Sequence, residues 1–307
     1  MQSANECFNK VKKNYLNFLI KEKIYNQSPS KQMESLRNVY IPISFWIVEK
    51  YKKKNKTLFL GLSGGQGSGK TTITNIIKII LKKYFKKNVC VISIDDFYKT
   101  LKDRTIMANK KHPLFKTRGV PGTHNINLIK EFFISLSKKK FKRTELPKFN
   151  KSIDDREKKL FWRRVKKKPE IVILEGWCVG AKPQLNSLLS KPINDLEKHE
   201  DKDLIWRKYV NDRLKNEYKK IFSMIDDFIF MKVPNIKLVF KWRYLQEKKL
   251  RKKYSNKKKV MTFTEIKRFI MFYERITLQM IEDLSKSASV LILFKKNHGV
   301  KKVLFKK

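Results

Sequence analysis

The segment Gly64-Gly-Gln-Gly-Ser-Gly-Lys-Thr71 has the residue types and the spacing that bind the phosphates of a nucleoside triphosphate. Its glycines allow consecutive backbone N–H groups to turn toward one point, and a helix that starts there adds positive potential. In such a loop the ammonium of Lys70 reaches the β- and γ-phosphates, and the hydroxyl of Thr71 holds Mg²⁺. The alternative is a chance match in a glycine-containing turn.

The elements expected around this loop favour phosphate binding over a chance match. An apolar run at 58–62 predicts a buried strand before it, and the apolar residues of 73–84 have the spacing of one helical face after it. A strand, a glycine loop and a helix N-terminus follow one another in the required order. The expected nucleotide contacts are Gly64, Gly65, Gln66, Gly67, Ser68, Gly69, Lys70, Thr71 and Thr72.

Carboxylates end two further apolar runs. Asp95 and Asp96 close the run 88–94, and Glu175 closes the run 169–175. Ligands of open parallel sheets bind at the carboxyl ends of strands, so we expect these carboxylates near the γ-phosphate. Asp95 would take the proton of an attacking hydroxyl or help to place the metal, and Glu175 would hold Mg²⁺ through water. Helix N-capping is the alternative role for either aspartate.

Basic residues lie in three further segments. Arg243, in a basic helix at 235–251, is our candidate for an arginine that closes over the phosphates; an ordinary solvated helix face is the alternative. The rigid segment Arg118-Gly-Val-Pro-Gly-Thr-His124 carries two polar groups suited to an acidic substrate. A second such segment is Leu146-Pro-Lys-Phe-Asn-Lys-Ser152, which is followed by Asp155-Arg156.

Five apolar runs separated by helical stretches predict a parallel sheet buried on both faces. The expected fold is an α/β P-loop NTPase with three αβα layers, a mainly parallel sheet, a helical lid and an N-terminal helical extension. We assign the extension to 1–55 and the P-loop domain, which the resemblance given below identifies as a kinase domain, to 56–307, with acceptor loops at about 98–168 and the lid at about 235–262. Pro42 is expected to break the N-terminal helices, 126–137 to be a helix, and 256–259 to form a flexible tip between two helices. The expected strands are 58–62, 88–94, 169–175, 227–233 and 289–294.

The formal net charge of +45 has two interpretations. Dense lysine and arginine bind nucleic acid or another anionic surface by releasing counterions, or solvated faces are simply rich in lysine. Short lysine runs occur along the whole chain, usually at the ends of elements, which favours the second interpretation. We therefore expect no specific nucleic-acid partner, although a positive field would attract ATP and anionic substrates.

No apolar stretch approaches the roughly 20 residues of a membrane span, so we expect no membrane association. The N-terminus shows no secretory signal. The three cysteines, Cys7, Cys90 and Cys178, are far apart and lack metal-site spacing. These features together predict a cytoplasmic protein.

Taken together, these segments resemble the P-loop kinases of the D-glycerate 3-kinase type, the plant and cyanobacterial enzymes. Those enzymes are distant relatives of phosphoribulokinase, uridine kinase and bacterial pantothenate kinase. The resemblance runs from about Leu58 to the last strand. The matching segments are the P-loop, Ser93-Ile-Asp-Asp-Phe-Tyr-Lys-Thr100, the two acceptor segments, Leu174-Glu-Gly-Trp177 with Val179-Gly180, and Trp242-Arg243 with Gln246-Glu247.

The resemblance implies ATP, Mg²⁺ and phosphorylation of the 3-hydroxyl of D-glycerate to give 3-phosphoglycerate. It aligns Asp95 with the aspartate proposed as base and Arg243 with a lid arginine; with Lys70 they form the expected catalytic set. Thr71 and Glu175 form the expected metal site. The expected substrate residues are Asp96, Tyr98, Arg118, His124, Lys151 and Arg156.

Several positions depart from the family pattern. Asn125 and Asn150 replace aspartates, Ser152-Ile-Asp-Asp-Arg156 replaces a glycine-rich approach to Asp-Arg, and Val260-Met-Thr-Phe-Thr-Glu265 replaces the usual Gly-Met-Ser-Asp-Glu. These departures concern substrate geometry, whereas the phosphate-handling residues are intact. The alternatives are a kinase for another hydroxylated metabolite, such as a nucleoside or a pantothenate-like acceptor, and a nucleic-acid-associated P-loop ATPase.

Overall fold

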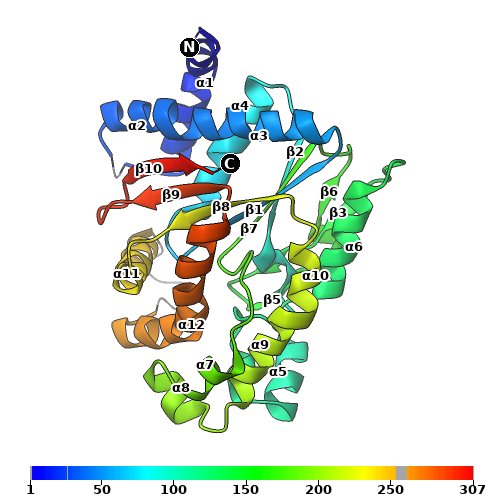
Figure 1. Cartoon of the computed structure of the whole chain (residues 1–307), viewed down its shortest axis with the longest axis vertical. Coiled ribbons are helices and arrows are strands. Elements are labelled where there is room, and N and C mark those ends of the chain that lie inside the picture. Colours follow the sequence, from blue (N-terminus) through cyan, green and yellow to red (C-terminus); the bar gives the residue numbers. More distant parts are fainter. Residues whose placement is uncertain (1, 26, 254–260, 307) are drawn as a thin grey trace.

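The computed structural model describes residues 2–25, 27–253 and 261–306. Its core is a six-stranded sheet in the order β10-β9-β8-β1-β7-β2 (Figure 1). Neighbouring strands are parallel except β9 and β10, so the predicted mainly parallel sheet is confirmed. The sequence did not predict β10, whose residues are half-buried or exposed and include two lysines. The strands are β1 (Leu58–Gly64), β2 (Val89–Ser93), β7 (Ile171–Gly176), β8 (Asp227–Lys232), β9 (Val290–Phe294) and β10 (Val300–Phe305).

Helices cover both faces of the sheet, which gives the predicted three layers. Alternate residues of β1 point to opposite faces. Leu58 and Leu60 belong to a core cluster with α3 and α4, whereas Phe59 belongs to a second cluster with α6, α9 and α10. The helices of the first layer are α3 (Ile41–Lys54) and α4 (Lys70–Lys83), and those of the second are α6 (Ile126–Ser137), α9 (Ile205–Arg213) and α10 (Lys219–Phe222).

The N-terminal residues are helical, but Pro42 does not break them. α1 (Gln2–Lys21) precedes α2 (Pro29–Ser35), a π-helical turn (Leu36–Tyr40) and α3, and the last three run on as one long helix in Figure 1. The π turn bonds each N–H five residues back, as Ile41 N does to Leu36 O. Pro42 then falls at the start of α3, where its missing N–H costs little. The predicted break is therefore wrong.

The segment between β2 and β7 is more regular than its glycines and prolines indicated. The predicted helix 126–137 is confirmed as α6, but α5 (Leu101–Lys110) also lies here. Two short antiparallel pairs follow, β3 (Thr144–Leu146) with β6 (Arg163–Val165), and β4 (Phe149–Asn150) with β5 (Asp155–Arg156). Strands of two or three residues leave too short an alternation to be recognised in the sequence.

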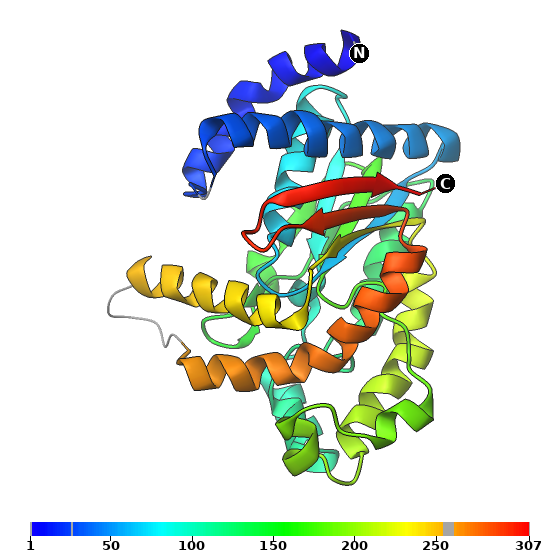
Figure 2. The ribbon, with the colours of Figure 1, turned by 60° about the vertical axis from the view of Figure 1, so that its left-hand side comes forward.

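Six α-helices of the described chain lie after β7. α11 (Ile236–Lys253) falls within the expected lid at about 235–262, whereas α12 (Phe263–Ser287) follows it, and the two helices lie side by side in Figure 2. The expected flexible tip at 256–259 falls outside the described residues. No helix in the described ranges combines the length and apolar character that a membrane crossing requires. The other helices after β7 are α7 (Asn186–Ser190) and α8 (Asp195–Glu200), followed by α9 and α10.

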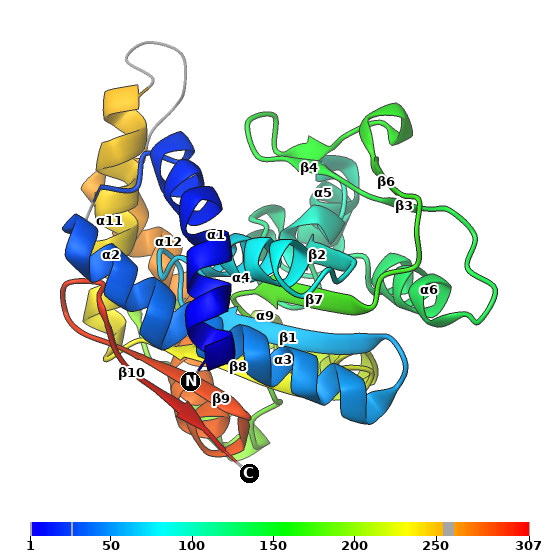
Figure 3. The ribbon, with the colours of Figure 1, turned by 90° about the horizontal axis from the view of Figure 1, so that it is seen from above.

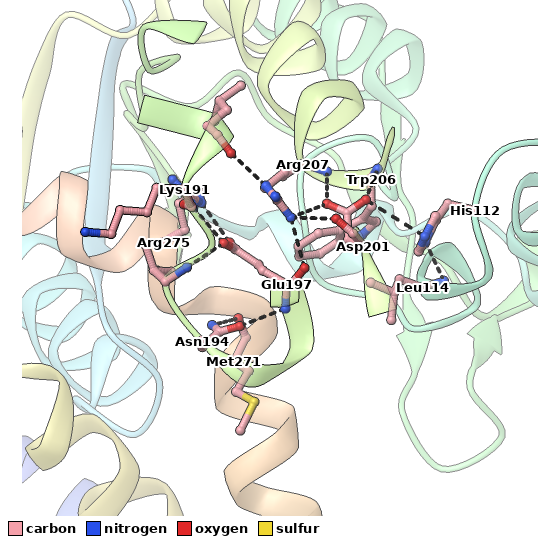
Figure 4. A network of polar contacts seen from close by, with 12 residues as sticks. His112, Leu114, Lys191, Asn194, Glu197, Asp201, Trp206, Arg207, Met271 and Arg275 are labelled. Atoms are coloured by element: carbon pink, nitrogen blue, oxygen red, sulfur yellow. Dashed lines mark hydrogen bonds and ion pairs between the residues drawn. The ribbon is translucent and has the colours of Figure 1, made fainter. Parts of the chain in front are cut away.

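One buried ion pair fastens α12 to the segment that carries α7 to α9, and a second lies within that segment (Figure 4). The guanidinium of Arg275 in α12 donates to both oxygens of Glu197, at 2.7 and 2.6 Å, and to the carbonyls of Leu188 and Lys191. Arg207 pairs with Asp201 at 2.9 Å, with both side chains almost fully buried. α12 is therefore fixed to the segment of α7 to α9.

We predict that Glu197→Gln lowers the free energy of unfolding by about 3–5 kcal/mol, because it leaves the buried guanidinium of Arg275 without its charge partner. Urea unfolding monitored by circular dichroism measures the change. Glu282→Gln is the matched control, since Glu282 pairs with Lys286 on the exposed face of the same helix and should shift stability by less than about 1 kcal/mol. An equal loss in both variants would contradict the account.

Candidate active site

The P-loop has a backbone that only glycine adopts readily. Gly67 and Gly69 have φ of 74° and 87°, in the left-handed region. A Cβ on Gly67 would lie 3.0 Å from the carbonyl carbon of Trp242 in α11. The glycines therefore serve both the turn of the loop and the close approach of the lid helix to it.

Lys70 lies at the start of α4 with its ammonium folded back over the loop. Its Nζ donates to the carbonyls of Gly64 at 2.9 Å and Gly65 at 3.0 Å. Burial lowers the pKa of Lys70, and the carboxylates of Glu175 and Asp95 oppose that shift. The cation is thus held beside two carboxylates and at the loop that would cradle phosphates.

Thr71 and Glu175 meet across the gap between α4 and β7. The Thr71 hydroxyl lies 3.1 Å from Oε1 of Glu175, which is 5% exposed at the end of β7. Burial raises the pKa of Glu175, against the opposing charge of Lys70. A hydroxyl and a carboxylate are hard oxygen ligands of the kind that Mg²⁺ prefers. The residues present fit that ion.

Asp95 lies in the 3₁₀ turn Ile94–Phe97 that follows β2. Its Oδ2 pairs with Nζ of Lys151 at 2.6 Å, and its Oδ1 accepts from the Tyr98 hydroxyl at 3.0 Å. Burial acts to raise the pKa of Asp95, but the charge and the hydrogen bond of Lys151 outweigh it and lower the pKa to about 2. Asp95 is therefore ionised at neutral pH and can accept a hydrogen bond from a hydroxyl.

Asp96 has the opposite environment. Its Oδ1 accepts from the backbone N–H of Phe149 at 3.4 Å, which ties β4 to the turn after β2. Burial, together with the negative charge of Asp95, raises the pKa of Asp96 to about 6. The pKa values of Asp95 and Asp96 thus differ because, of these two carboxyls, only that of Asp95 forms an ion pair with a lysine.

The segment 118–124 is held in place by α12 and by the residue that follows β7. Tyr273 of α12 donates to the Arg118 carbonyl at 3.2 Å, and the Trp177 indole donates to the Gly119 carbonyl at 3.0 Å. A Cβ on Gly119 would overlap the Tyr273 hydroxyl. The Arg118 guanidinium pairs with Asp154 and lies 5.4 Å from the centre of the Phe149 ring. The arginine therefore belongs to the packing between the two acceptor segments.

His124 is 1% exposed and stacks on Tyr98, with ring centres 4.5 Å apart. Its Nδ1 lies 2.6 Å from the Tyr218 hydroxyl. Burial lowers the pKa of His124 to about 4, so the ring is neutral at neutral pH and offers no cation to an acidic substrate. Arg156 also contacts Tyr98, since its Nη2 donates to the Tyr98 carbonyl at 2.6 Å. Both residues support Tyr98 and, through it, Asp95.

Arg243 lies in α11 close to the P-loop, since a Cβ on Gly67 would be 3.1 Å from its backbone nitrogen. Its guanidinium is bound within the lid by Glu247 and by Gln246, the latter at 3.0 Å, and lies 5.4 Å from the Phe269 ring centre. Burial lowers the pKa of Arg243, and the Glu247 carboxylate opposes that effect. Arg243 must exchange these partners to reach a phosphate.

Both departures from the family pattern in the acceptor segments have structural roles. Asn125 caps α6, where its side-chain oxygen accepts from Leu128 N at 3.1 Å. Asn150 donates to Glu157 at 2.9 Å and accepts from Ser152 N at 2.9 Å. Asparagine fills a helix N-cap as well as aspartate does. These substitutions therefore preserve the local backbone.

The structure brings Lys70, Thr71, Glu175, Asp95 and Lys151 to the carboxyl edge of β1, β2 and β7. Arg118, His124, Arg156 and Tyr98 form the wall behind Asp95, and Arg243 lies in the lid. The sequence analysis missed Tyr218, Tyr273 and Asp154, which fix that wall. The tyrosines lie in ordinary amphipathic segments and give no local signal, whereas Asp154 stands in the segment already noted for Arg156.

Comparisons with known proteins show the family and the fold of the chain. Residues 59–207 match the sequence model of the phosphoribulokinase/uridine kinase family. The chain is 31% identical over 250 residues to the "Probable ATP-dependent kinase TDA10" of Saccharomyces cerevisiae, covering 74% of this chain and 79% of that protein. It is 29% identical over 234 residues to the chloroplastic D-glycerate 3-kinase of Arabidopsis thaliana, covering 70% of this chain and 48% of that protein. The solved D-glycerate 3-kinase of Cryptococcus neoformans has the same fold, with a TM-score of 0.73 at 19% identity. The match covers 91% of this chain and 100% of the solved chain.

We predict that Asp96→Asn raises the thermal midpoint near neutral pH. A carboxyl whose pKa is raised to about 6 in the fold, from 3.8 ordinarily, stabilises the fold below 3.8, and this contribution is lost as pH rises through 6. Asparagine does not ionise, so the variant avoids this loss of stability, and its side-chain oxygen can still accept from the backbone N–H of Phe149. The variant and the wild type should converge below pH 3.8.

Asp95→Asn is the matched comparison and should shift the thermal midpoint in the opposite direction. The lowered pKa of Asp95 in the wild type gives stability that is present above the ordinary value of 3.8 and lost as pH falls through about 2. Its midpoint should therefore lie below that of the wild type near neutral pH. Shifts of the same sign in the two variants, measured by differential scanning fluorimetry, would contradict the assigned environments.

Proposed function

Because this chain belongs to the phosphoribulokinase/uridine kinase family of P-loop kinases, we propose that it transfers the γ-phosphate of ATP to the 3-hydroxyl of D-glycerate, giving 3-phosphoglycerate. The observation that carries the proposal is the meeting of an intact P-loop with an ionised, lysine-paired aspartate at one edge of the sheet. The family relationship supplies ATP-dependent phosphoryl transfer, and the acceptor is our inference.

The chemistry asks the protein for positioning and charge neutralisation rather than for covalent catalysis. Lys70 would leave the carbonyls of Gly64 and Gly65 to contact the β- and γ-phosphates. Asp95 would accept a hydrogen bond from the attacking hydroxyl and orient it in line with the γ-phosphorus. Arg243 would exchange Glu247 for the phosphates when the lid closes.

Magnesium, held by Thr71 and Glu175, would neutralise charge on the phosphate oxygens. Glu175 is kept at the end of β7 by the sheet, in register with Leu62 of β1 and Ser93 of β2. This placement lets the Glu175 carboxylate face Thr71 of α4 without any movement of the backbone. We infer that the Thr71–Glu175 pair is the metal side of the site.

A small carboxylate such as D-glycerate suits the cations next to Asp95. Lys151 is 61% exposed in its side chain while paired to Asp95, so it can turn from that residue to a bound carboxylate. Arg118 lies on the neighbouring segment, with its guanidinium over the Phe149 ring at 5.4 Å. The plant relative named D-glycerate 3-kinase is 29% identical to this chain, which supports the same acceptor.

A second acceptor class is considered because of one cavity beside the acceptor segments, although Lys70, Asp95 and Lys151 do not line it. An open space of about 410 Å³ beside His124 is lined by polar residues that include Lys99, Asn125, Asn127 and Glu217. Sites for ligands well above the size of glycerate have volumes of this order. A nucleoside or a pantothenate-like acceptor is therefore the runner-up.

A coupled assay of ADP release separates the two. We predict turnover with D-glycerate and Mg·ATP, and little with L-glycerate, uridine or pantothenate. Turnover with uridine or pantothenate alone would replace D-glycerate by the runner-up class. No ADP release with any of these acceptors would contradict the proposed reaction.

Lys70→Ala and Asp95→Asn should each lower kcat by at least about 100-fold, because each removes charge or orientation required in the transition state. Lys82→Ala, an exposed lysine near the other end of α4, is the matched control and should retain wild-type turnover. All three are assayed below their thermal midpoints. Near-normal turnover of Asp95→Asn would remove Asp95 from the mechanism.

A further inference from the structure

Lysine runs that lie far apart in the sequence meet at one end of the sheet. β1, β2 and β7 are parallel and start in register, since Leu58 and Val89 both pair with Ile171. The chain segments before these strands therefore lie side by side. Leu58 N donates to the Glu170 carbonyl, and Glu170 N donates to the Asn88 carbonyl, both at 2.9 Å. We call this edge the start edge.

Many exposed basic side chains surround the start edge. The pairing of Thr144 with Val165 in the β3–β6 ladder also brings the chain before β3 beside the chain after β6. Figures 1 and 3 show the turn from α3 to β1, the start of β2 and the link from β6 to β7 at the same end of the molecule. The exposed residues are Lys52, Lys53, Lys56, Lys82, Lys83, Lys86, Lys142, Arg143, Lys166 and Lys167.

The carboxylates at this edge are already paired to other lysines. Asp226 pairs with Lys54 at 2.5 Å, and Glu170 pairs with Lys87 at 2.7 Å. Of the exposed basic residues just named, only Lys53 has an ion-pair partner in the described part of the chain. The start edge therefore keeps an uncompensated positive charge.

Helix capping does not account for this cluster. Lysines in the last turns of α3 and α4 interact favourably with the helix dipole. Lys56, Lys86, Lys166 and Lys167, however, lie in turns outside any helix. Like charges this close repel one another and lower stability unless an anion covers them.

We propose that the start edge binds the phosphate backbone of double-stranded nucleic acid without sequence preference. Lysine outnumbers arginine among the exposed cations, and lysine contacts phosphates as a point charge, whereas arginine supplies most specific base contacts. The nearby aromatic rings are half-buried and packed, as Tyr84 and Phe85 are on Phe45, so they form no stacking platform for single strands.

A lipid surface fits the start edge less well. Stable peripheral membrane anchoring combines cations with apolar side chains or a lipid chain that enter the interface. In the described residues, the large exposed apolar side chains lie in other segments, such as Leu160 and Phe161. Charge alone is enough for sequence-independent binding to nucleic acid.

The start edge is separate from the phosphate-binding loop. β1 has seven residues from Leu58 to Gly64, so the strand separates the two ends by roughly 20 Å. A bound duplex therefore leaves the P-loop accessible, and the binding does not depend on the identity of the acceptor substrate. ATP should not compete with the duplex.

Fluorescence anisotropy of a labelled DNA duplex with the full chain tests the proposal. We predict that log affinity falls linearly with log salt, with a slope of magnitude about 5 or more. The triple variant Lys82→Glu, Lys83→Glu, Lys86→Glu should lose at least about tenfold in affinity and about 3 in slope. A second triple variant at Lys142, Lys166 and Lys167 should act in the same direction.

The matched control is Lys110→Glu, Lys111→Glu, Lys198→Glu, which makes the same charge change on exposed residues of the α5 and α8 regions, away from the start edge in Figure 1. It should keep wild-type affinity and slope. Equal losses of affinity and slope in the control would mean that net charge alone explains the binding, which would overturn the proposed site. Competition by ATP, or binding to phosphatidylserine vesicles without binding to the duplex, would overturn it too.

Discussion

The parallel pairing of β1 with β7, and of β7 with β2, is the constraint on which the architecture depends. Parallel strands buried on both faces must end at a common edge, and the register places Glu175 beside Leu62 and Ser93. The P-loop leaves this edge from β1, and Asp95 leaves it from β2. Because the same register aligns the strand starts, it also gathers the lysine runs at the opposite edge.

Charge balance around two adjacent carboxyls then defines the acceptor side. Lys151 keeps Asp95 ionised, whereas burial favours the protonated form of Asp96. An aspartate with a low pKa is a weak base, but it is ionised at neutral pH and can accept a hydrogen bond from a hydroxyl. This suits phosphoryl transfer through a loose transition state, in which orienting the hydroxyl matters more than early proton removal.

The sequence predicted which residues of the P-loop and of the strand ends meet at one edge of the sheet, because its signals for them are local. Gly64 to Thr71 form a motif whose function requires a fixed backbone, and Asp95 and Glu175 end apolar runs that can only be buried strands. The wall behind Asp95 could not be predicted in the same way. Tyr273 approaches Gly119 from a helix more than 150 residues away, and nothing near Tyr273 in the sequence indicates that contact.

Other differences between expectation and structure also have physical causes. Proline usually breaks a helix, but Pro42 follows the π turn and falls at the start of α3, where its missing N–H costs little. Lysine runs such as Lys82-Lys83 and Lys166-Lys167 look scattered along the chain, since only the strand register brings them together. Local periodicity predicts elements, whereas surfaces made by several elements require the fold.

The position of the transferred phosphate tests the central claim most directly. The account predicts that the phosphorus spectrum of the product from D-glycerate and ATP shows coupling to the two protons of a methylene group, as for a 3-phosphate. Coupling to a single methine proton, as for a 2-phosphate, or the absence of any phosphorylated glycerate, would contradict it.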